Sequence, residues 1–454
     1  MPKHFAALGM VLALAGSALV AADAKESTYR GWKSLELSNG LIRVQVVPGV
    51  GGRIMQVTLG DFEHLWVNDG LAGKGPTPTG LGPEGSWLNY GGSKLWPAPQ
   101  GWGREDRWPG PPDAILDGGE HEGSITADKG EAASILLVSR KDPRSGIQFT
   151  RSVKVRDGAS RVSIDCTMKN IDTKNRRWGI WQVTQHGTAN RKGDGFDKGI
   201  RVWVPLNPKS IHPNGYRVLF GARDNPQFKA DGGMMCVHYR HLVGKIAMDC
   251  SAGWYALVNG TAGRVFVERF EWHGDKPYPD DASVEVWTQG AGSIEAWGKE
   301  VKMSDDVKEN PYLLETEVLS PFAELKPGET FSHHTDWYVA RIGGDHPVVG
   351  CNGLGVACEP LKAALSEGKL ILAGRFGVFY KAEAVLSLAD GRGKEVLRGQ
   401  AKLGVSPDEP LVLSPGSKLA QGVRVPAEAA KACLLLLDAS GKPIAALASA
   451  EIQR

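Results

Sequence analysis

Apolar and polar residues alternate along most of this chain with the period of two that β-strands show. The stretch "IQFTRSVKVR" at 147–156 has apolar residues at alternate positions, and "RVSIDCTMKN" at 161–170 follows after a break that contains Asp and Gly. Antiparallel strands with one buried face produce this pattern. Similar segments lie at 41–48, 53–60, 133–140, 201–206, 245–250, 253–260, 264–272, 283–288, 312–320 and 331–341. The pattern therefore predicts a large antiparallel β structure, most naturally two big sheets packed face to face.

Only two segments have the composition and apolar spacing of a helix. They are "EPLKAALSEG" at 359–368 and "PAEAAKAC" at 426–433. Both carry several Ala, Leu, Glu and Lys residues, which favour helices. We therefore expect short helices at these two places and strands almost everywhere else.

A change of pattern near residue 343 divides the chain. The large β domain is expected at 28–342, followed by a loop-like linker at 343–358, "GGDHPVVGCNGLGVAC". The rest, 359–454, has short alternating segments separated by turns such as "ADGRG", and this spacing suits a small immunoglobulin-like β-sandwich. It carries no pattern typical of a catalytic site, so we expect a packing or attachment module.

The first residues are typical of a secretory signal. Lys3 and His4 precede an apolar run, and Ala22-Asp23-Ala24 offers small residues at the usual cleavage positions. We predict a signal peptide at 1–24 and a periplasmic or secreted bacterial protein. A retained membrane anchor is the alternative, but the run is barely long enough to span a bilayer and no later stretch approaches that length, so we expect no membrane insertion after cleavage.

Composition excludes several classes of function. The chain of 454 residues has 53 basic and 51 acidic residues, a net charge of +2, and no basic block. Nucleic-acid binding is therefore not expected. The 58 glycines point to many turns between strands, and the 14 tryptophans are also unusual in number.

Cysteines and histidines do not define a metal site. Cys351 and Cys358 either close a small disulfide loop or remain two thiols, and the spacing alone leaves both readings open. Histidines at 238, 241, 273, 333 and 334 have no fixed set of converging ligands around them. We expect neither a metal nor another cofactor.

The segment 90–106, "YGGSKLWPAPQGWGRED", combines glycines, prolines, a lysine and two tryptophans. This mixture is unlike a core strand or a helix, and it predicts a shaped loop that presents aromatic rings. Trp96 and Trp102 are expected to offer flat apolar area to a ligand, and Lys94 to donate a hydrogen bond to it. The alternative is that these rings plug one end of the sandwich and touch only protein.

Two segments resemble the galactose mutarotase-like β-supersandwich family, which includes the aldose 1-epimerases. They are 35–68, which contains "NG" and then "PGVGGRI", and 313–341, in which an acidic strand precedes "LKPGE" and a final tryptophan-bearing strand. The segment 90–102 resembles a loop of an exported bacterial branch of this fold. The resemblance covers most of 30–342 and implies a supersandwich with a carbohydrate ligand. Trp96 and Trp102 would then contact the apolar face of a sugar, and Lys94 would donate to its hydroxyls.

In the epimerases of this family, a glutamate acts as general base on the anomeric hydroxyl and a histidine as general acid on the ring oxygen. Glu315 and Glu317 lie two apart in "LLETEVLS", so a strand directs both to one face, and Leu314, Thr316 and Val318 to the other. By its distance from the "LKPGE" turn, Glu317 is the closer match for the base. The alternative is that both carboxylates face solvent or pair with arginines.

The histidine motif of the epimerases is not reproduced. The corresponding segment is 169–190, "KNIDTKNRRWGIWQVTQHGTAN", in which His186 lies near the expected place but Trp181, Gln182 and Thr184 fit as well. We retain His186 as candidate acid and Trp181 and Gln182 as ligand contacts. Arg53, which follows the double glycine at a strand start, is a further candidate for substrate binding.

Three hypotheses follow. The first is an exported carbohydrate-binding protein that is also an epimerase-like or other sugar-active enzyme, with Glu317 or Glu315 as base. In the second, the same residues hold a sugar without catalysis. In the third, the chain is a structural envelope protein without a sugar site.

Overall fold

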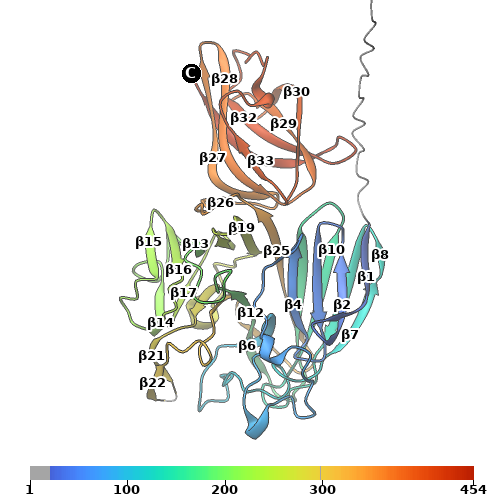
Figure 1. Cartoon of the computed structure of the whole chain (residues 1–454), viewed down its shortest axis with the longest axis vertical. Helices are drawn as coiled ribbons and strands as arrows, with labels where there is room; N and C mark the ends of the chain where they lie inside the picture. Colours follow the sequence, from blue (N-terminus) through green and yellow to red (C-terminus); the bar gives the residue numbers. More distant parts are fainter. Residues whose placement is uncertain (1–20, 297) are drawn as a thin grey trace, which may run out of the picture.

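The computed structural model describes residues 21–296 and 298–454, and in this part of the chain two large sheets pack face to face (Figure 1). The first has 13 strands and the second has 10. Their pairings are antiparallel throughout. The all-β supersandwich predicted from the sequence is confirmed.

The 13-stranded sheet runs in the order β14 (Arg217–Gly221), β17 (Gly244–Met248), β20 (Val284–Thr288), β23 (Leu313–Leu319), β12 (Arg176–Gly187), β6 (Ser93–Ala98), β4 (Arg53–Leu59), β3 (Ile42–Val47), β2 (Trp32–Ser38), β1 (Ala22–Tyr29) and β8 (Lys129–Gly130). Beside this path, β5 (Phe62–Glu63) pairs with β4, and β24 (Ala323–Leu325) pairs with β12.

The 10-stranded sheet runs in the order β15 (Phe228–Asp231), β16 (Met234–His238), β13 (Ile200–Pro205), β18 (Trp254–Asn259), β19 (Arg264–Phe270), β25 (Thr330–Arg341), β11 (Arg161–Asn170), β10 (Ile147–Arg156), β9 (Ala132–Val138) and β7 (Glu122–Ala127). A separate hairpin consists of β21 (Gly292–Ala296) and β22 (Lys299–Met303).

The core lies between the two sheets. In β10, every second residue from Ile147 to Val155 is buried, which is the alternation read from the sequence. These side chains meet those of the first sheet, such as Ile54 and Val57, in one apolar cluster that also contains Phe266 and Trp337. Burial of this face stabilises the sandwich.

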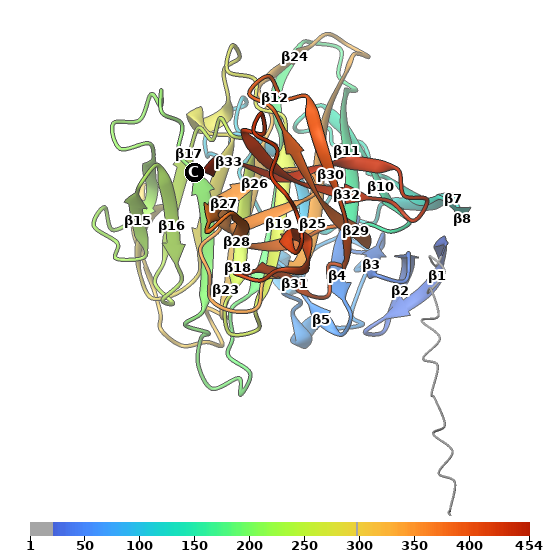
Figure 2. The ribbon, with the colours of Figure 1, turned by 90° about the horizontal axis from the view of Figure 1, so that it is seen from above.

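The C-terminal part forms an eight-stranded sheet around an apolar core of its own. In Figures 1 and 2 it lies over one end of the supersandwich. Its order is β30 (Glu395–Val405), β29 (Ala382–Ala389), β32 (Lys431–Leu437), β33 (Pro443–Gln453), β27 (Gly355–Ser366), β28 (Lys369–Val378) and β31 (Pro410–Leu413), and β26 (Gly350–Cys351) pairs with β27.

The two predicted helices are wrong. Residues 359–366 belong to β27, residues 426–430 form a turn, and residues 431–433 are the start of β32. The described residues contain no α-helix, only the 3₁₀ turns η1 (Asp69–Leu71), η2 (Pro83–Gly85), η3 (Pro279–Asp281) and η4 (Lys418–Ala420). Pairing with neighbouring strands outweighs the local helix propensity of these segments.

Two boundaries also differ from the sequence-based assignment. The expected linker at 343–358 contains β26 and the start of β27. Strand β1 begins at Ala22, inside the segment assigned to the signal peptide, of which residues 1–20 lie outside the described part of the chain.

Cys351 and Cys358 are free thiols, so this pair does not form the disulfide that was one of the two alternatives. Among the residues that the structure describes, no helix is both long and apolar enough to cross a membrane.

Candidate functional site

A cavity of about 610 Å³ lies on the face of the 13-stranded sheet that points away from the intersheet core. The alternation of β12 identifies this face, because Trp181 and Gln185 line the cavity whereas Gln182 contacts Thr335 of the opposite sheet. Loops around residues 66–71, 87–89, 100–111 and 308–311 form its walls.

Aromatic rings dominate the lining. Five indoles and one phenyl ring contribute to it: Trp66, Trp87, Trp96, Trp181, Trp287 and Phe220. The polar lining consists mainly of amides and carboxylates: Asn68, Asn89, Gln100, Gln185, Gln289, Glu309, Glu315 and Glu317, with Lys245 and Lys308. Such a mixture of apolar area and a few fixed polar groups is typical of small-molecule sites.

Strand β23 brings two carboxylates into this cavity. Glu315 and Glu317 both line it, and Thr316 between them faces the core, where its Oγ1 lies 2.7 Å from the hydroxyl of Tyr255. This is the orientation that the alternation of "LLETEVLS" predicted. The two carboxylates nevertheless have different partners.

Glu315 is paired with a lysine. Lys94 Nζ lies 2.9 Å from Glu315 Oε1, and Gln185 Nε2 donates to the same oxygen at 2.7 Å. Both contacts leave Oε2 of Glu315 available to a ligand. Burial opposes ionisation of Glu315, but the charge and hydrogen bond of Lys94 outweigh it, so the pKa of Glu315 lies below its ordinary value.

Glu317 shares its lysine with another carboxylate. Lys245 Nζ lies 2.9 Å from Glu317 Oε2 and 2.6 Å from Oε2 of Glu285, which faces Glu317 across the β20–β23 pair. Trp181 Nε1 also donates to Glu317 Oε2, at 2.7 Å. These contacts engage Oε2 and leave Oε1 to carry a proton.

Burial raises the pKa of Glu317 to about 8, and the nearby charges of Glu285 and Glu315 act in the same direction against Lys245. A protonated Glu317 leaves two charge-balanced pairs, Lys94 with Glu315 and Lys245 with Glu285. The site is then neutral overall, as a buried cluster of charges requires. The pKa values of the two carboxyl groups are thus shifted in opposite directions, downward for Glu315 and upward for Glu317.

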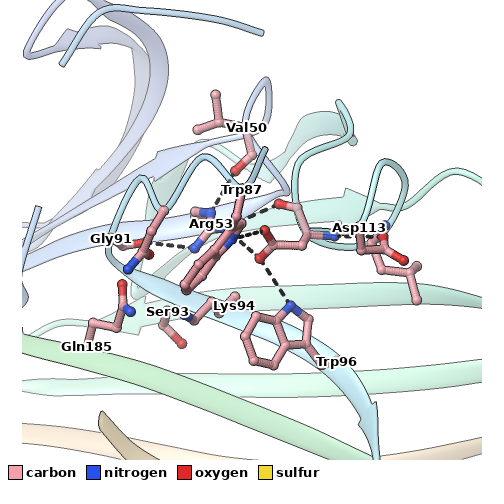
Figure 3. Close-up of polar contacts among 12 residues, drawn as sticks. Val50, Arg53, Trp87, Gly91, Ser93, Lys94, Trp96, Asp113 and Gln185 are labelled. Atoms are coloured by element: carbon pink, nitrogen blue, oxygen red, sulfur yellow. Dashed lines mark hydrogen bonds and ion pairs between the residues drawn. The ribbon is translucent and has the colours of Figure 1, made fainter. Parts of the chain in front are cut away.

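Asp117 holds two of the cavity tryptophans. Its Oδ2 accepts from Trp87 Nε1 at 2.7 Å, and its Oδ1 accepts from Trp96 Nε1 at 3.2 Å and from Arg53 Nη2 at 2.7 Å (Figure 3). Arg53 also donates to the carbonyl oxygens of Val50 and Gly91. This buried ion pair fixes the loop that carries Trp87 against the strand that carries Trp96.

The double glycine before Arg53 permits this packing. Gly51 has φ +75° and Gly52 has φ +55°, and a Cβ on Gly51 would lie 1.9 Å from the carbonyl oxygen of Asp117. A Cβ on Gly52 would lie 2.1 Å from the imidazole Nδ1 of His121. The "GGR" motif therefore brings the backbone close to the Asp117 segment and supplies the arginine that balances it.

Segment 90–106 was predicted to be a loop, but Ser93–Ala98 is strand β6, buried at every position. Trp96 lines the cavity from this strand. Lys94 lies on the same face but is fully buried, between the rings of Trp87 (5.1 Å) and Trp96 (4.5 Å) and Glu315. Lys94 thus orients Glu315 from below the cavity surface and has no exposed atoms for a sugar.

The geometry corrects the roles expected for His186 and Gln182. Both project from β12 into the intersheet core: His186 Nε2 lies 2.9 Å from Thr316 Oγ1, and Gln182 Nε2 donates to Thr335 Oγ1 at 2.9 Å. Burial lowers the pKa of His186 to about 4. Neither side chain reaches the cavity, so His186 is no candidate acid and Gln182 no ligand contact.

Two further candidates do not line the cavity. Arg53 is fully buried in its pair with Asp117, so it positions tryptophans and touches no ligand. Trp102 lies beyond β6 in the loop that follows and is absent from the cavity lining. Trp96 and Trp181, with Glu315 and Glu317, are the predicted residues that the structure brings together.

Several lining residues were not foreseen as site residues. Trp66 follows β5, Lys245 is in β17, and Trp287 is in β20 beside Glu285. Lys245 lies in the segment "KIAM" and Glu285 in the segment "VEVW", both otherwise apolar. A charged residue in an apolar strand is unusual, and this feature could have been recognised from the sequence.

No group of three or more His, Cys, Asp or Glu side chains among residues 21–296 and 298–454 could hold a metal ion.

Comparison with family models gives one match, the Domain of unknown function (DUF4380), over residues 32–340. The chain belongs to the DUF4380 family. The matched region is the supersandwich, from β2 to the end of β25, and contains the whole cavity. No curated protein matches this DUF4380 sequence.

Several solved structures are similar to this DUF4380 protein. A TPR-domain containing protein from Parabacteroides distasonis is 13% identical over 71% of this chain, with a TM-score of 0.47, and the match spans 49% of that protein. A galactose mutarotase-like protein from Lactobacillus casei is 12% identical over 67% of this chain and 99% of its own, with a TM-score of 0.43.

A galactose mutarotase-like protein from Clostridium acetobutylicum is 10% identical over 71% of this chain and 99% of its own, with a TM-score of 0.43. These two proteins carry the name of the family that the sequence motifs resembled.

Proposed function

We propose that the cavity binds a carbohydrate and that Glu315 and Glu317 act on it as a base and an acid. The observation that carries this proposal is the presence, in one cavity, of five indoles and two carboxyl groups with different lysine partners, which shift their pKa values in opposite directions. Pairs of titratable groups whose pKa values are pushed apart are the usual basis of acid–base catalysis.

The lining suits a neutral, polyhydroxylated ligand. Indole rings offer flat apolar area to the C–H faces of a sugar ring at a small cost in conformational entropy. Two amide oxygens in the lining, Asn89 Oδ1 and Gln185 Oε1, are buried without a hydrogen-bond partner. Hydroxyl groups of a sugar would satisfy both acceptors, and an unsatisfied buried acceptor is otherwise costly.

The proposed reaction is anomer interconversion, which needs one proton removed and one delivered. In this proposal Glu315 replaces Glu317, the closer match from the sequence, as the base. The free Oε2 of Glu315 takes the proton of the anomeric hydroxyl while Glu317 delivers its proton to the ring oxygen. The bond between the anomeric carbon and the ring oxygen breaks, and the open-chain aldehyde rotates about its C1–C2 bond. The reverse transfers close the ring with the other configuration and restore both carboxyl groups.

The surrounding residues support this division of roles. Lys94 and Gln185 hold Oε1 of Glu315 and keep this carboxylate ionised. Lys245 is shared with Glu285, so its charge does not suffice to keep Glu317 ionised as well. Trp181 fixes Glu317 through its indole N–H and lines the cavity beside it.

We also propose that the protein is exported to the periplasm or secreted. The apolar run at 1–24 supports this proposal. N-terminal sequencing of the protein recovered from culture would test it, and recovery of the intact leader in the cytoplasm would contradict it.

The catalytic proposal is tested with Glu317→Gln, which keeps the shape of the side chain and removes its titration. Sugar binding is measured by tryptophan fluorescence and anomer exchange by nuclear magnetic resonance. We expect binding within about threefold of wild type and exchange reduced by about a hundredfold or more. The control is Glu324→Gln in β24, an exposed residue paired with Arg177, which is expected to change neither quantity.

The outcomes separate the hypotheses. Sugar binding without anomer exchange in the wild type would identify a non-catalytic binding protein, the second candidate. Absence of a fluorescence response to neutral and acidic sugars alike would remove the carbohydrate proposal and leave the structural one.

A further inference from the structure

A second cavity, of about 230 Å³, opens where the two large sheets meet at the C-terminal end of β12. Its walls come from β5 and the residues after it, from the segment that follows β12, and from the turn between β18 and β19. Gln185 is the last residue of β12 that lines the first cavity, and Gly187 lines the second. The two cavities are thus neighbours along β12 but have no lining residue in common.

The two arginines of this cavity form no ion pair within the described residues. Arg264 and Arg191 both line it, and neither forms an ion pair with any residue in the described ranges 21–296 and 298–454. Arg264 also faces Arg341 across the β19–β25 pair. Two arginines opposite each other on neighbouring strands repel. Burial and this repulsion lower the pKa of Arg264, and the charge of Asp408 opposes them.

Two buried nitrogen atoms in the lining have no hydrogen-bond partner, Arg264 Nη1 and His64 Nε2. The His64 residue is only 6% exposed. Burial and the charge of Arg264 hold the pKa of His64 well below its ordinary value, so the imidazole is neutral. A neutral imidazole can still donate one N–H to an anion.

The acidic residues of the lining are already engaged. Glu63 is paired with Arg30 at 2.5 Å, and Asp197 accepts from Thr261 Oγ1 at 2.6 Å and from the backbone N–H of Gly199 at 2.8 Å. The guanidinium of Arg264 lies over the ring of Phe62, 5.5 Å from its centroid, which orients it. The two buried lining atoms without a hydrogen-bond partner are thus both donors, whereas Asp197 accepts both of its hydrogen bonds at Oδ1.

We propose that this second cavity is a binding site for a small oxyanion, phosphate or a carboxylate, held by Arg264 with His64 and Arg191. An oxyanion satisfies both orphaned donors and compensates the repulsion between Arg264 and Arg341. The planar fork of a guanidinium is suited to two oxygens of one anion. This site is independent of the carbohydrate proposal, because the two cavities share no lining residue.

The test is titration calorimetry with inorganic phosphate, sulfate and acetate at constant ionic strength. We expect saturable binding of at least one of them to the full chain, and affinity at least about tenfold weaker in Arg264→Gln, because a charged hydrogen bond is lost. The matched control is Arg392→Gln, an exposed arginine in the β29–β30 turn of the C-terminal domain, which is expected to bind like wild type.

Thermal unfolding gives a second readout. The bound anion is expected to raise the unfolding temperature of wild type and of Arg392→Gln, but not that of Arg264→Gln. If Arg264→Gln does not fold, the exposed Arg191→Gln decides, with weaker binding expected. Absence of saturable binding to wild type, or equal affinity in wild type and the folded Arg264 or Arg191 variant, would overturn the proposal.

Discussion

At the scale of single residues, the partners of Glu315 and Glu317 decide what each carboxyl group can do. Both project from one strand into one cavity, only two positions apart. Glu315 has Lys94 to itself, whereas Glu317 shares Lys245 with Glu285. One lysine cannot neutralise two buried carboxylates, so Glu317 retains its proton. The different environments of Glu315 and Glu317 thus arise from a third carboxylate, Glu285, on the neighbouring strand.

This assignment predicts an unusual dependence of stability on pH. Burial raises the pKa of Glu317 to about 8 in the folded protein, above its ordinary value of 4.5. Between these two pH values the folded state holds a proton that the unfolded state releases, so the contribution of Glu317 to stability falls as pH rises. A tenfold difference in proton affinity between the two states corresponds to about 1.4 kcal/mol. Glu317→Gln removes this titration, and its stability relative to wild type should increase from pH 5 to pH 9.

Urea unfolding of both proteins across this range measures the difference. Glu315→Gln serves as the control, because the pKa of Glu315 shifts on folding in the direction opposite to that of Glu317. The pKa of Glu315 is lowered on folding, so its favourable contribution is present at neutral pH and disappears only as pH falls through the folded pKa. A stability difference between Glu317→Gln and wild type that does not change with pH would contradict a protonated Glu317.

The sequence predicted site residues only in strands whose apolar–polar alternation shows which face each side chain occupies. The alternation of "LLETEVLS" placed Glu315 and Glu317 on one face of the strand, and in the structure both line the cavity. In β12 the pattern is buried on both faces, so no polar–apolar alternation distinguishes them. The candidate His186 is one position away from Gln185, which lines the cavity, and a shift of one residue reverses the face.

At the scale of elements, strand pairing determines the structure of two segments whose local sequence indicated a loop or a helix. The glycines and prolines around 91–99 suggested a loop, yet Ser93–Ala98 pairs along β12 and meets β4 only at Ser93. Because β4 does not pair beyond Ser93, a proline can occupy position 97 without losing hydrogen bonds on that side. The helical look of 359–366 failed likewise, since β28 and β33 supply pairing partners that the local sequence does not reveal.

The turn before β4 yields a prediction about the element that carries Arg53. Gly51→Ala places a Cβ 1.9 Å from the Asp117 carbonyl oxygen and also a side chain at φ +75°. We expect a loss of about 3 kcal/mol or more of unfolding free energy, from a left-handed backbone cost of about 1–2 kcal/mol and the displacement of the Asp117 segment. Chemical denaturation measures the loss.

Gly60→Ala separates these two causes. Gly60 has φ +60°, but no atom lies within 4 Å of a Cβ built there. This variant should therefore lose only the backbone term, about 1–2 kcal/mol. Equal losses in the two variants would mean that the close approach to Asp117 does not matter. A selective loss at Gly51 should be accompanied by a change in the fluorescence of Trp87 and Trp96, which Asp117 holds.

At the scale of the whole molecule, the cavity exists because sheet order joins distant segments. β17, β20, β23, β12 and β6 are neighbours in the sheet, although residues 94 and 317 are far apart in the chain. Alternation predicts which face a residue occupies, but strand order decides which residues meet. For this reason Lys245, Glu285 and Trp287 could not be joined to Glu317 from the sequence, whereas the all-β fold class could be.

The two domains are joined by an apolar cluster of their own. Trp254, Tyr338 and Ile342 of the supersandwich pack with Val356 and Phe379 of the C-terminal domain. The rings of Tyr338 and Phe379 stack at 4.4 Å with 18° between their planes. The backbone N–H of Ser160 also donates to the carbonyl oxygen of Phe379 at 2.8 Å. The C-terminal domain therefore covers a face of the supersandwich that would otherwise expose aromatic side chains.

Phe379→Ala tests whether this contact docks the domains. The residue is fully buried, and its removal should cost about 3–5 kcal/mol, mostly at the junction. We expect the segment after Arg341 to become susceptible to trypsin while the supersandwich and its cavity remain folded. Phe376→Ala is the matched control, because Phe376 is equally buried but packs in the core of the C-terminal domain. It should lower the unfolding temperature of that domain without opening Arg341 to cleavage under native conditions. Similar cleavage in both variants would mean that the C-terminal core, and not the Tyr338–Phe379 stack, holds the domains together.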